Sequence, residues 1–190
     1  MVTAKKADKF KRKMWYSVVS PVLFNRKEIA TTPALEPKDI IGRTIKTNAF
    51  VLLGNIKKQS ISIKLQITGL KDNNAETMIK EYWIPHMHLS RVIRHGGRKI
   101  QVDEAVETKD KKKVAITMMV LTKGRSTETQ NKEISKAVHD YIKQELPKLN
   151  YDSLILNALM AKIQTEIKIN AKKIFPLKFV EINRIRLMAA

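Results

Sequence analysis

The stretch QSISIKLQITGL (59–70) decides the fold of this chain, because apolar residues occupy every second position from Ile61 to Ile67. This alternation predicts a β-strand with one buried and one solvated face. KDNNAE (71–76) follows the strand and has the composition of a turn. TMIKEYWI (77–84) then returns as a second strand, so the three segments together predict an antiparallel hairpin.

Three segments before this hairpin make up the N-terminal part of the chain. WYSVVSP (15–21) is predicted to be a strand that Pro21 stops. NRKEIATTPALEP (25–37) is predicted to be a connection, because its two prolines and paired threonines rule out a long helix. IIGRTIKTNAFVLLG (40–54) begins as a strand and is expected to leave that conformation near Asn48.

The segments after the hairpin predict a short helix and a second hairpin. HLSRVIRHGG (88–97) has the pattern of a short helix, with Ser90 as a candidate N-cap and Gly96–Gly97 as its end. RKIQVDEAVETK (98–109) and KKVAITMMVLTK (112–123) are strand-like segments on either side of a two-residue turn. We therefore expect a mainly antiparallel sheet.

Two helices and one strand complete the chain. STETQNKEISKAVHDYIKQEL (126–146) has an apolar face at helical spacing and ends before Pro147. The pattern from Tyr151 to about Lys172 predicts a second, uninterrupted helix. FPLKFVEINRIRLM (175–188) alternates apolar and charged residues and predicts a last strand.

This order of elements predicts an α+β fold. We expect a mainly antiparallel curved sheet or partly open β-barrel with flanking helices, to which the C-terminal strand returns. A single domain is predicted over residues 15–190, after a basic tail of residues 1–14 that is disordered without RNA. Within the domain, residues 15–123 are expected to be β-rich, residues 124–174 helical, and residues 175–188 the final strand.

The charge of the chain points to a polyanionic partner. Its 190 residues include 37 Lys and Arg against 18 Asp and Glu, which gives a net charge of +19. A small body with this excess repels itself unless a polyanion neutralises it, and nucleic acid is the first candidate, before an acidic membrane surface. The absence of cysteine and of any apolar run of roughly 18–20 residues predicts a soluble protein of the cytoplasm.

Residues capable of catalysis do not form a known pattern. A metal site at His86 and His88 is disfavoured, because we expect a loop there and the nearest carboxylate, Glu81, is five positions from His86. HGGRK (95–99) lacks the spacing of a phosphate-binding loop, and no GxGxxG motif occurs. The carboxylates of the predicted strand 98–109 are typical of a solvated face. We therefore expect no enzyme, no cofactor and no metal site.

Two pairs of aromatic residues could stack on unpaired bases. They are Trp15–Tyr16 and Tyr82–Trp83, and each pair lies in a predicted strand. One member of each pair must therefore face inward. We expect the tryptophans to pack in the core, so the sequence shows no motif for base-specific recognition.

Several segments, in order along the chain, resemble one known family. They are KRKMWYSVVSPVLFNRKEIATTPA (11–34), DIIGRTIKTN (39–48), ISIKLQITGL (61–70), LSRVIRHGGRKIQVDEAVETKD (89–110) and KKIFPLKFVEINRIRLM (172–188). Together they resemble the archaeal and eukaryotic small-subunit ribosomal protein family S3Ae, also called S1e. The helix after Tyr151 has no interrupting glycine, although relatives often have one, and the long C-terminal extension of eukaryotic members is missing. In these two features the chain resembles an archaeal-type member of the family.

The resemblance implies a non-enzymatic structural protein of the small ribosomal subunit in the cytoplasm. Members of the family lie on the platform of that subunit, near the 3′ end of its rRNA and the mRNA exit. The implied partners are small-subunit rRNA, neighbouring ribosomal proteins and mRNA near the exit, with no membrane and no small-molecule substrate. The family fold resembles a β-barrel-like body with flanking helices.

On this interpretation, the tail threads into rRNA while Trp15 and Tyr16 anchor its root in the barrel. Cations in tails, turns and loops are suited to contact phosphates, which position a protein on RNA without reading its sequence. The predicted rRNA contacts are Lys5, Lys6, Lys9, Lys11, Arg12, Lys13, Arg26, Lys27, Arg91, Arg94, Arg98, Lys99, Lys123 and Arg125.

Three other functions are compatible with a strongly basic chain. The first is a free, sequence-nonspecific nucleic-acid-binding protein of the chromatin type, which would bind duplex DNA and RNA alike. An RNA-modifying enzyme would need a cofactor loop or a catalytic cluster. A membrane-surface protein would need a helix with a broad apolar face and a basic opposite face, and the predicted helix 126–146 is slightly acidic on its solvated side.

Overall fold

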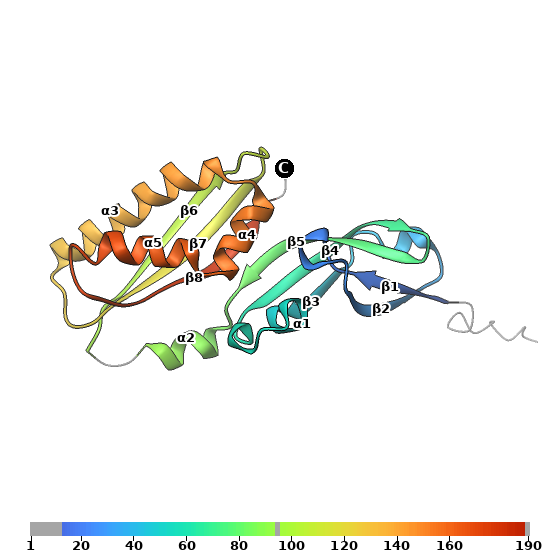
Figure 1. The fold of residues 1–190 in the computed structure, drawn as a ribbon, viewed down its shortest axis with the longest axis horizontal. Coiled ribbons are helices and arrows are strands. Elements are labelled where there is room, and N and C mark those ends of the chain that lie inside the picture. The colour runs from blue at the N-terminus through green and yellow to red at the C-terminus, as the bar shows by residue number, and fades with distance from the viewer. Residues whose placement is uncertain (1–12, 94–95, 189–190) are drawn as a thin grey trace, which may run out of the picture.

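The computed structural model describes residues 13–93 and 96–188 of the chain. These residues form an eight-stranded, mostly antiparallel sheet with helices on one face of its C-terminal half (Figure 1). The strands are β1 (Met14–Val19), β2 (Glu28–Ala34), β3 (Thr44–Asn48), β4 (Ser62–Lys71), β5 (Asn74–Trp83), β6 (Lys99–Glu107), β7 (Lys113–Thr122) and β8 (Leu177–Leu187). The predicted α+β class and both predicted hairpins are confirmed.

Five α-helices and four short 3-10 turns connect the strands. The helices are α1 (Ala49–Leu53), α2 (His86–Val92), α3 (Glu128–Glu145), α4 (Tyr151–Leu159) and α5 (Lys162–Ala171). The 3-10 turns are η2 (Val22–Phe24), η3 (Pro37–Ile40), η4 (Ile56–Lys58) and η5 (Leu146–Lys148). None of the helices in the described residues has the length and apolar character needed to cross a membrane.

Strand β5 joins the two halves of the molecule (Figure 1). It pairs with β4 along most of its length. Its other edge pairs in parallel with β1 at Asn74–Glu76 and antiparallel with β8 at Glu81–Trp83. The last strand, β8, therefore returns between β5 and β7, which confirms the prediction that it pairs with a sheet formed much earlier in the chain.

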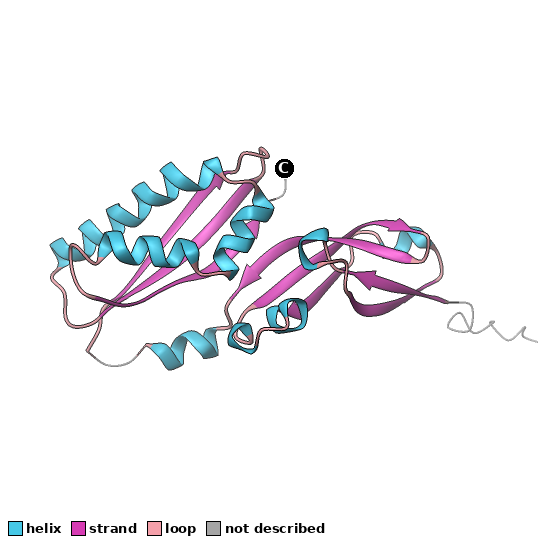
Figure 2. Cartoon of the chain, in the orientation of Figure 1, coloured by secondary structure: helices cyan, strands magenta, loops and turns pink. Residues whose placement is uncertain are grey.

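The larger hydrophobic core lies between the helices and the C-terminal half of the sheet. Figure 2 shows α3, α4 and α5 on one side of strands β6, β7 and β8. The predicted apolar face of α3 supplies Ile134, Val138 and Ile142, which are fully buried. Full burial of such a side chain stabilises the fold by about 1.5–3 kcal/mol, so this layer fixes the helices to one face.

A smaller core lies at the N-terminal end of the sheet. Tyr16 and Val18 of β1 pack there with Ile40 of η3 and Ile67 of β4. Arg43 fastens this end, because its guanidinium donates hydrogen bonds of 2.9 Å to the Thr32 hydroxyl and to the Pro33 carbonyl. This side chain links β2 to the residue just before β3, although the two strands do not pair in the sheet.

Three predictions of local structure were wrong: strand β2 was missed, helix α2 begins earlier than expected, and the predicted helix 151–172 is broken. Residues 25–37 are not only a connection, because β2 forms there as an edge strand beside β1. An edge position leaves one side of the strand unpaired, so Pro33 is tolerated although it has no N–H to donate. Helix α2 begins after Pro85, not near Ser90, whose hydroxyl bonds back to the His86 carbonyl at 2.9 Å. His86 and His88 are therefore helical, whereas a loop was predicted.

The third difference is a break in the predicted helix 151–172. Helix α4 ends at Leu159, and α5 begins after Ala161, which has φ 60 and ψ 23 in the left-handed region. The bend turns two apolar stripes toward the core, one with Leu154 and Leu159 and the other with Ile163 and Ile167. Burial of both stripes outweighs the strain of a left-handed alanine, which is roughly 1–2 kcal/mol.

Candidate nucleic-acid interface

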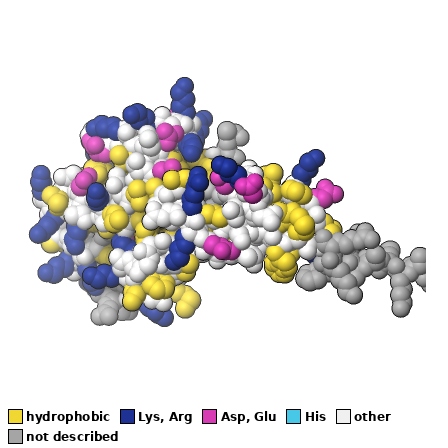
Figure 3. All heavy atoms as spheres, turned by 45° about the vertical axis from the view of Figure 1, so that its right-hand side comes forward, with side chains coloured by type: hydrophobic (Ala, Val, Ile, Leu, Met, Phe, Trp, Pro, Cys, Tyr) yellow, Lys and Arg dark blue, Asp and Glu magenta, His cyan; other side chains and the backbone are white. Residues whose placement is uncertain are grey.

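The described cations among the predicted RNA contacts all lie outside the core. Lys13 is half-buried just before β1, and the other seven are exposed in turns, loops and element ends: Arg26, Lys27, Arg91, Arg98, Lys99, Lys123 and Arg125. Figure 3 shows Lys and Arg side chains spread over much of one face of the body. The predictions for Lys5, Lys6, Lys9, Lys11, Arg12 and Arg94 fall outside the described residues.

The structure brings the predicted contacts Arg98 and Lys99 close to the predicted contacts Lys123 and Arg125. The Arg98 N–H donates to the Thr122 hydroxyl at 2.8 Å, and the Thr122 N–H donates to the Arg98 carbonyl at 3.0 Å. The start of β6 therefore lies against the end of β7. This pairing places Arg98 and Lys99 next to the loop that carries Lys123 and Arg125, and we call these four residues the loop cluster.

Gly97 makes this close pairing possible. A Cβ atom at residue 97 would lie 2.5 Å from the Thr122 carbonyl oxygen, which is closer than real Cβ contacts allow. The Thr122 hydroxyl is fully buried and also donates to the Gly124 carbonyl at 2.7 Å. The backbone that presents the loop cluster is thus fixed by hydrogen bonds and by one obligatory glycine.

The Arg26–Lys27 pair lies elsewhere and has a structural role in part. Lys27 Nζ donates to the Val51 carbonyl at 3.0 Å, near the C-terminal end of α1, where carbonyls lack helical partners. Arg26 lines a hollow between the end of β1 and the start of α4, together with Lys112 and Tyr151. This hollow also contains the carboxylates of Asp72, Glu76 and Asp152, so its charge is mixed.

A second set of cations was missed in the sequence. Lys46 of β3, Lys64 of β4 and Arg184 and Arg186 of β8 lie on the face of the sheet that is turned away from α3, α4 and α5. We call this the outer face. The alternation of Lys64 with Ile63 and Leu65 predicts a solvated position, but no local pattern shows that strands distant in sequence place these cations side by side.

The outer-face cations line a groove of about 440 Å³. Its other lining residues are Glu81, Trp83, Ile84 and Asn183. Glu81 is nearly buried and pairs with the Arg184 guanidinium. The groove therefore combines one neutralised ion pair with three further cations and an aromatic ring.

The prediction that both tryptophans pack in the core was wrong, because neither indole belongs to a core cluster of the described residues. Tyr16 and Tyr82 take the inward positions, with exposed fractions of 2% and 0%, so their tryptophan neighbours point outward. Trp15 is 59% exposed, and Trp83 is half-buried. Of the predicted pair of anchors, Tyr16 is the residue that packs in the core. The sequence correctly required one inward residue in each pair, but aromatic size does not decide which.

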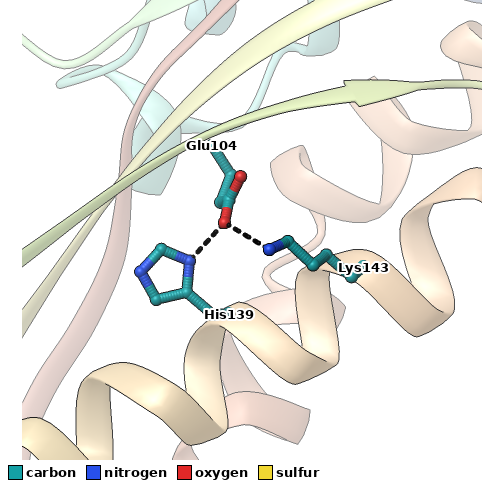
Figure 4. Close-up of polar contacts among 3 residues, drawn as sticks. All are labelled: Glu104, His139 and Lys143. Atoms are coloured by element: carbon teal, nitrogen blue, oxygen red, sulfur yellow. Dashed lines mark hydrogen bonds and ion pairs between the residues drawn. The ribbon is translucent and has the colours of Figure 1, made fainter.

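Glu104, His139 and Lys143 form a polar cluster between β6 and α3 (Figure 4). Glu104 Oε1 lies 2.5 Å from His139 Nδ1 and 3.2 Å from Lys143 Nζ. The hydrogen bonds from Lys143 and His139 hold the pKa of the Glu104 carboxyl below its ordinary value, against the opposing effect of partial burial. The contacts of Glu104 on β6 with His139 and Lys143 on α3 fasten the helix to the sheet.

Among the described residues, no group of three or more His, Asp or Glu side chains could hold a metal ion. The surface of residues 13–93 and 96–188 carries many exposed Lys and Arg side chains, exposed carboxylates such as Glu28 and Asp103, and the exposed indole of Trp15. The cations are suited to phosphates, and the indole is suited to stacking on a base.

Comparison with known proteins identifies relatives over nearly the whole chain. The model of the Ribosomal S3Ae family matches residues 2–190. Small ribosomal subunit protein eS1 of Staphylothermus marinus is 33% identical over 181 residues, which are 95% of this chain and 85% of that protein. The proteins of the same name from Methanobrevibacter smithii and Methanothermobacter thermautotrophicus are 32% and 30% identical, and the matches cover 95% of this chain and 94% and 93% of those proteins.

Proposed function

Because the chain belongs to the ribosomal S3Ae family, we propose that it is a structural constituent of the small ribosomal subunit that binds rRNA. The family match over residues 2–190 is the observation that carries this function. It confirms the resemblance found in the sequence, and with it a ribosomal protein and not an enzyme. Relatives from three archaea have the name of a small-subunit protein, and this chain aligns with most of their length.

Within the subunit, the proposed position is the platform near the mRNA exit. The resemblance of the sequence to the family supports this position. The net charge of +19 supports a site surrounded by RNA, because rRNA phosphates would relieve the repulsion among the cations.

The proposed phosphate contacts are the loop cluster, Arg26, Lys27, Arg91 and the cations of the tail. Exposure of Arg98, Lys99, Lys123 and Arg125 on a fixed backbone supports the loop cluster in particular, because preordered cations lose less entropy on binding. Lys27 is the weakest member of the set, since its ammonium is already bonded to the Val51 carbonyl.

The helical layer is proposed to face neighbouring ribosomal proteins. Met160, just after α4, and Ile169 of α5 are 59% and 60% exposed. Burial of these two side chains against another protein would remove apolar area from water, which favours association. The outer face of the sheet would then be left for RNA.

Sedimentation tests the proposed function. Lysate from cells that produce the chain is separated on a sucrose gradient in about 0.5 M salt, at which loose electrostatic binders dissociate. We expect the chain to migrate with small subunits in about equimolar amount. A duplex-binding protein of the chromatin type would remain at the top of the gradient, and it would bind duplex DNA and RNA alike when isolated.

A further inference from the structure

We propose that the groove on the outer face binds one unpaired nucleotide of RNA, whose base stacks on Trp83 while Lys46, Lys64 and Arg186 hold its phosphates. This inference rests on the proposed function, because rRNA would supply the nucleotide. The proposed function describes only general contacts of cations with phosphates, whereas this inference names one site and unpaired RNA as its ligand.

The register of four strands sets the geometry of the groove. Lys46, Lys64, Glu81 and Arg186 are consecutive partners across β3, β4, β5 and β8. Directly paired residues point to the same face of a sheet. Neighbouring strands are about 4.8 Å apart, so this row spans roughly 15 Å. The row is thus long enough for an extended segment of a nucleic-acid backbone but much shorter than a duplex-binding surface.

The charges in the row favour an anion. Glu81 is the only carboxylate among the lining residues, and it pairs with Arg184, whose side chain is 47% exposed. Lys46, Lys64 and Arg186 have no carboxylate partner within the described part of the chain. Three uncompensated cations around one groove therefore attract phosphate groups.

Trp83 supplies the surface for a base. It is two residues from Glu81 on β5, and its cross-strand partners are Ser62 on one side and Arg184 on the other. The indole is half-buried, so packing restricts its orientation while part of it remains open to the groove. Aromatic rings between cations are the usual platform for unpaired bases, because every base has a face that can stack.

The size of the groove selects an unpaired nucleotide over a duplex. Its volume of about 440 Å³ lies within the range of pockets for small ligands, about 300–1,000 Å³. A base inside a duplex is stacked on its neighbours and cannot reach Trp83. The site should therefore distinguish single-stranded from double-stranded RNA.

Fluorescence reports on the site directly. The chain has two tryptophans, so Trp15→Phe leaves Trp83 as the only one while an aromatic ring is kept at residue 15. This protein is titrated with single-stranded oligoadenylate and with duplex RNA of the same length. We expect strong quenching by the single strand only. In the native background, Trp83→Leu should weaken single-strand binding by about tenfold, and Trp83→Phe should restore most of the affinity.

The lysines are tested through the salt dependence of binding. Each phosphate contact with a single strand contributes about −0.7 to the slope of log K against log salt. Loss of two contacts in K46Q/K64Q should therefore reduce the slope by about 1.4. The matched control is K132Q/K136Q, which removes the same charge from exposed positions of α3 and should leave the slope unchanged.

The proposal is overturned if duplex RNA quenches Trp83 as strongly as the single strand does. It is also overturned if both Trp83 variants bind oligoadenylate like the native protein, or if polyglutamate quenches Trp83 and competes with the RNA, since the groove would then recognise acidic peptide. These measurements use free protein. Failure of the chain to sediment with small subunits would overturn the ribosomal function independently of the result at the groove.

Discussion

Ala161 has a left-handed backbone conformation that its sequence context does not predict. Helix propensity favours alanine, yet the residue adopts a left-handed conformation between α4 and α5. Glycine has no Cβ and takes this conformation without strain. The residues of 151–172 therefore have the pattern of one helix, whereas the chain folds into two.

Ala161→Gly should stabilise the protein. Relief of left-handed strain exceeds the added entropy of the unfolded chain, which predicts a gain of about 0.5–1 kcal/mol. For a chain of this size that raises Tm by about 1–4 °C. The control is Ala137→Gly inside α3, which should lower stability by about 1 kcal/mol. Calorimetry showing a lower Tm for Ala161→Gly would mean that α4 and α5 form one continuous helix.

Glu104 gives stability a dependence on pH. Its pKa in the folded protein is lowered by Lys143 and His139, so its contribution is present above the pKa of the unfolded chain. The contribution is lost as pH falls through the lowered pKa of the folded state. Glu104→Gln should therefore decrease Tm by about 2–4 °C at pH 7, and the two proteins should converge in acid. An equal difference at pH 7 and pH 3, measured by thermal unfolding, would contradict this role.

At the scale of elements, the sequence predicted most strands and helices because their apolar periodicity is local. Both hairpins, α3 and β8 follow this pattern. The edge strand β2 was missed because Pro33 and the surrounding polar residues hide its pairing with β1. The break between α4 and α5 was missed because it depends on packing against the sheet, which local spacing does not encode.

The pairing of β6 with β7 can be tested at Gly97. Gly97→Ala places a methyl group against the Thr122 carbonyl, so the start of β6 must shift. We expect a loss of about 1–3 kcal/mol, as for other overpacked sites, and weaker RNA binding by the displaced loop cluster. Gly124→Ala is the control, because nothing lies within 4 Å of its Cβ position. Urea unfolding that shows equal stability for both variants would contradict the close approach.

At the scale of the whole molecule, composition predicted the class of partner but not the surface that meets it. The excess of cations and their clusters in loops are visible in the sequence, as is the family resemblance. The outer face is not, because Lys46 and Arg186 are separated by most of the chain and meet only through the register of β3, β4, β5 and β8. The outer face is therefore formed by the pairing of strands that are distant in the sequence, which local sequence patterns do not reveal.

On the proposed function, the two sides of the molecule have different roles. Helices α3, α4 and α5 cover one face of the C-terminal half of the sheet (Figure 1). Trp83, Lys46, Lys64 and Arg186 line the groove on the opposite face. We propose that the outer face and the loop cluster meet RNA while the helical layer does not.

The most direct test is a cryo-EM map of the small ribosomal subunit from cells that produce this chain. We expect the chain to lie on the platform, with rRNA against the outer face and the loop cluster. We also expect an unpaired base at Trp83 and protein or solvent against α4 and α5. A map in which rRNA packs on the helices, while the outer face is open to solvent, would contradict the proposed interface.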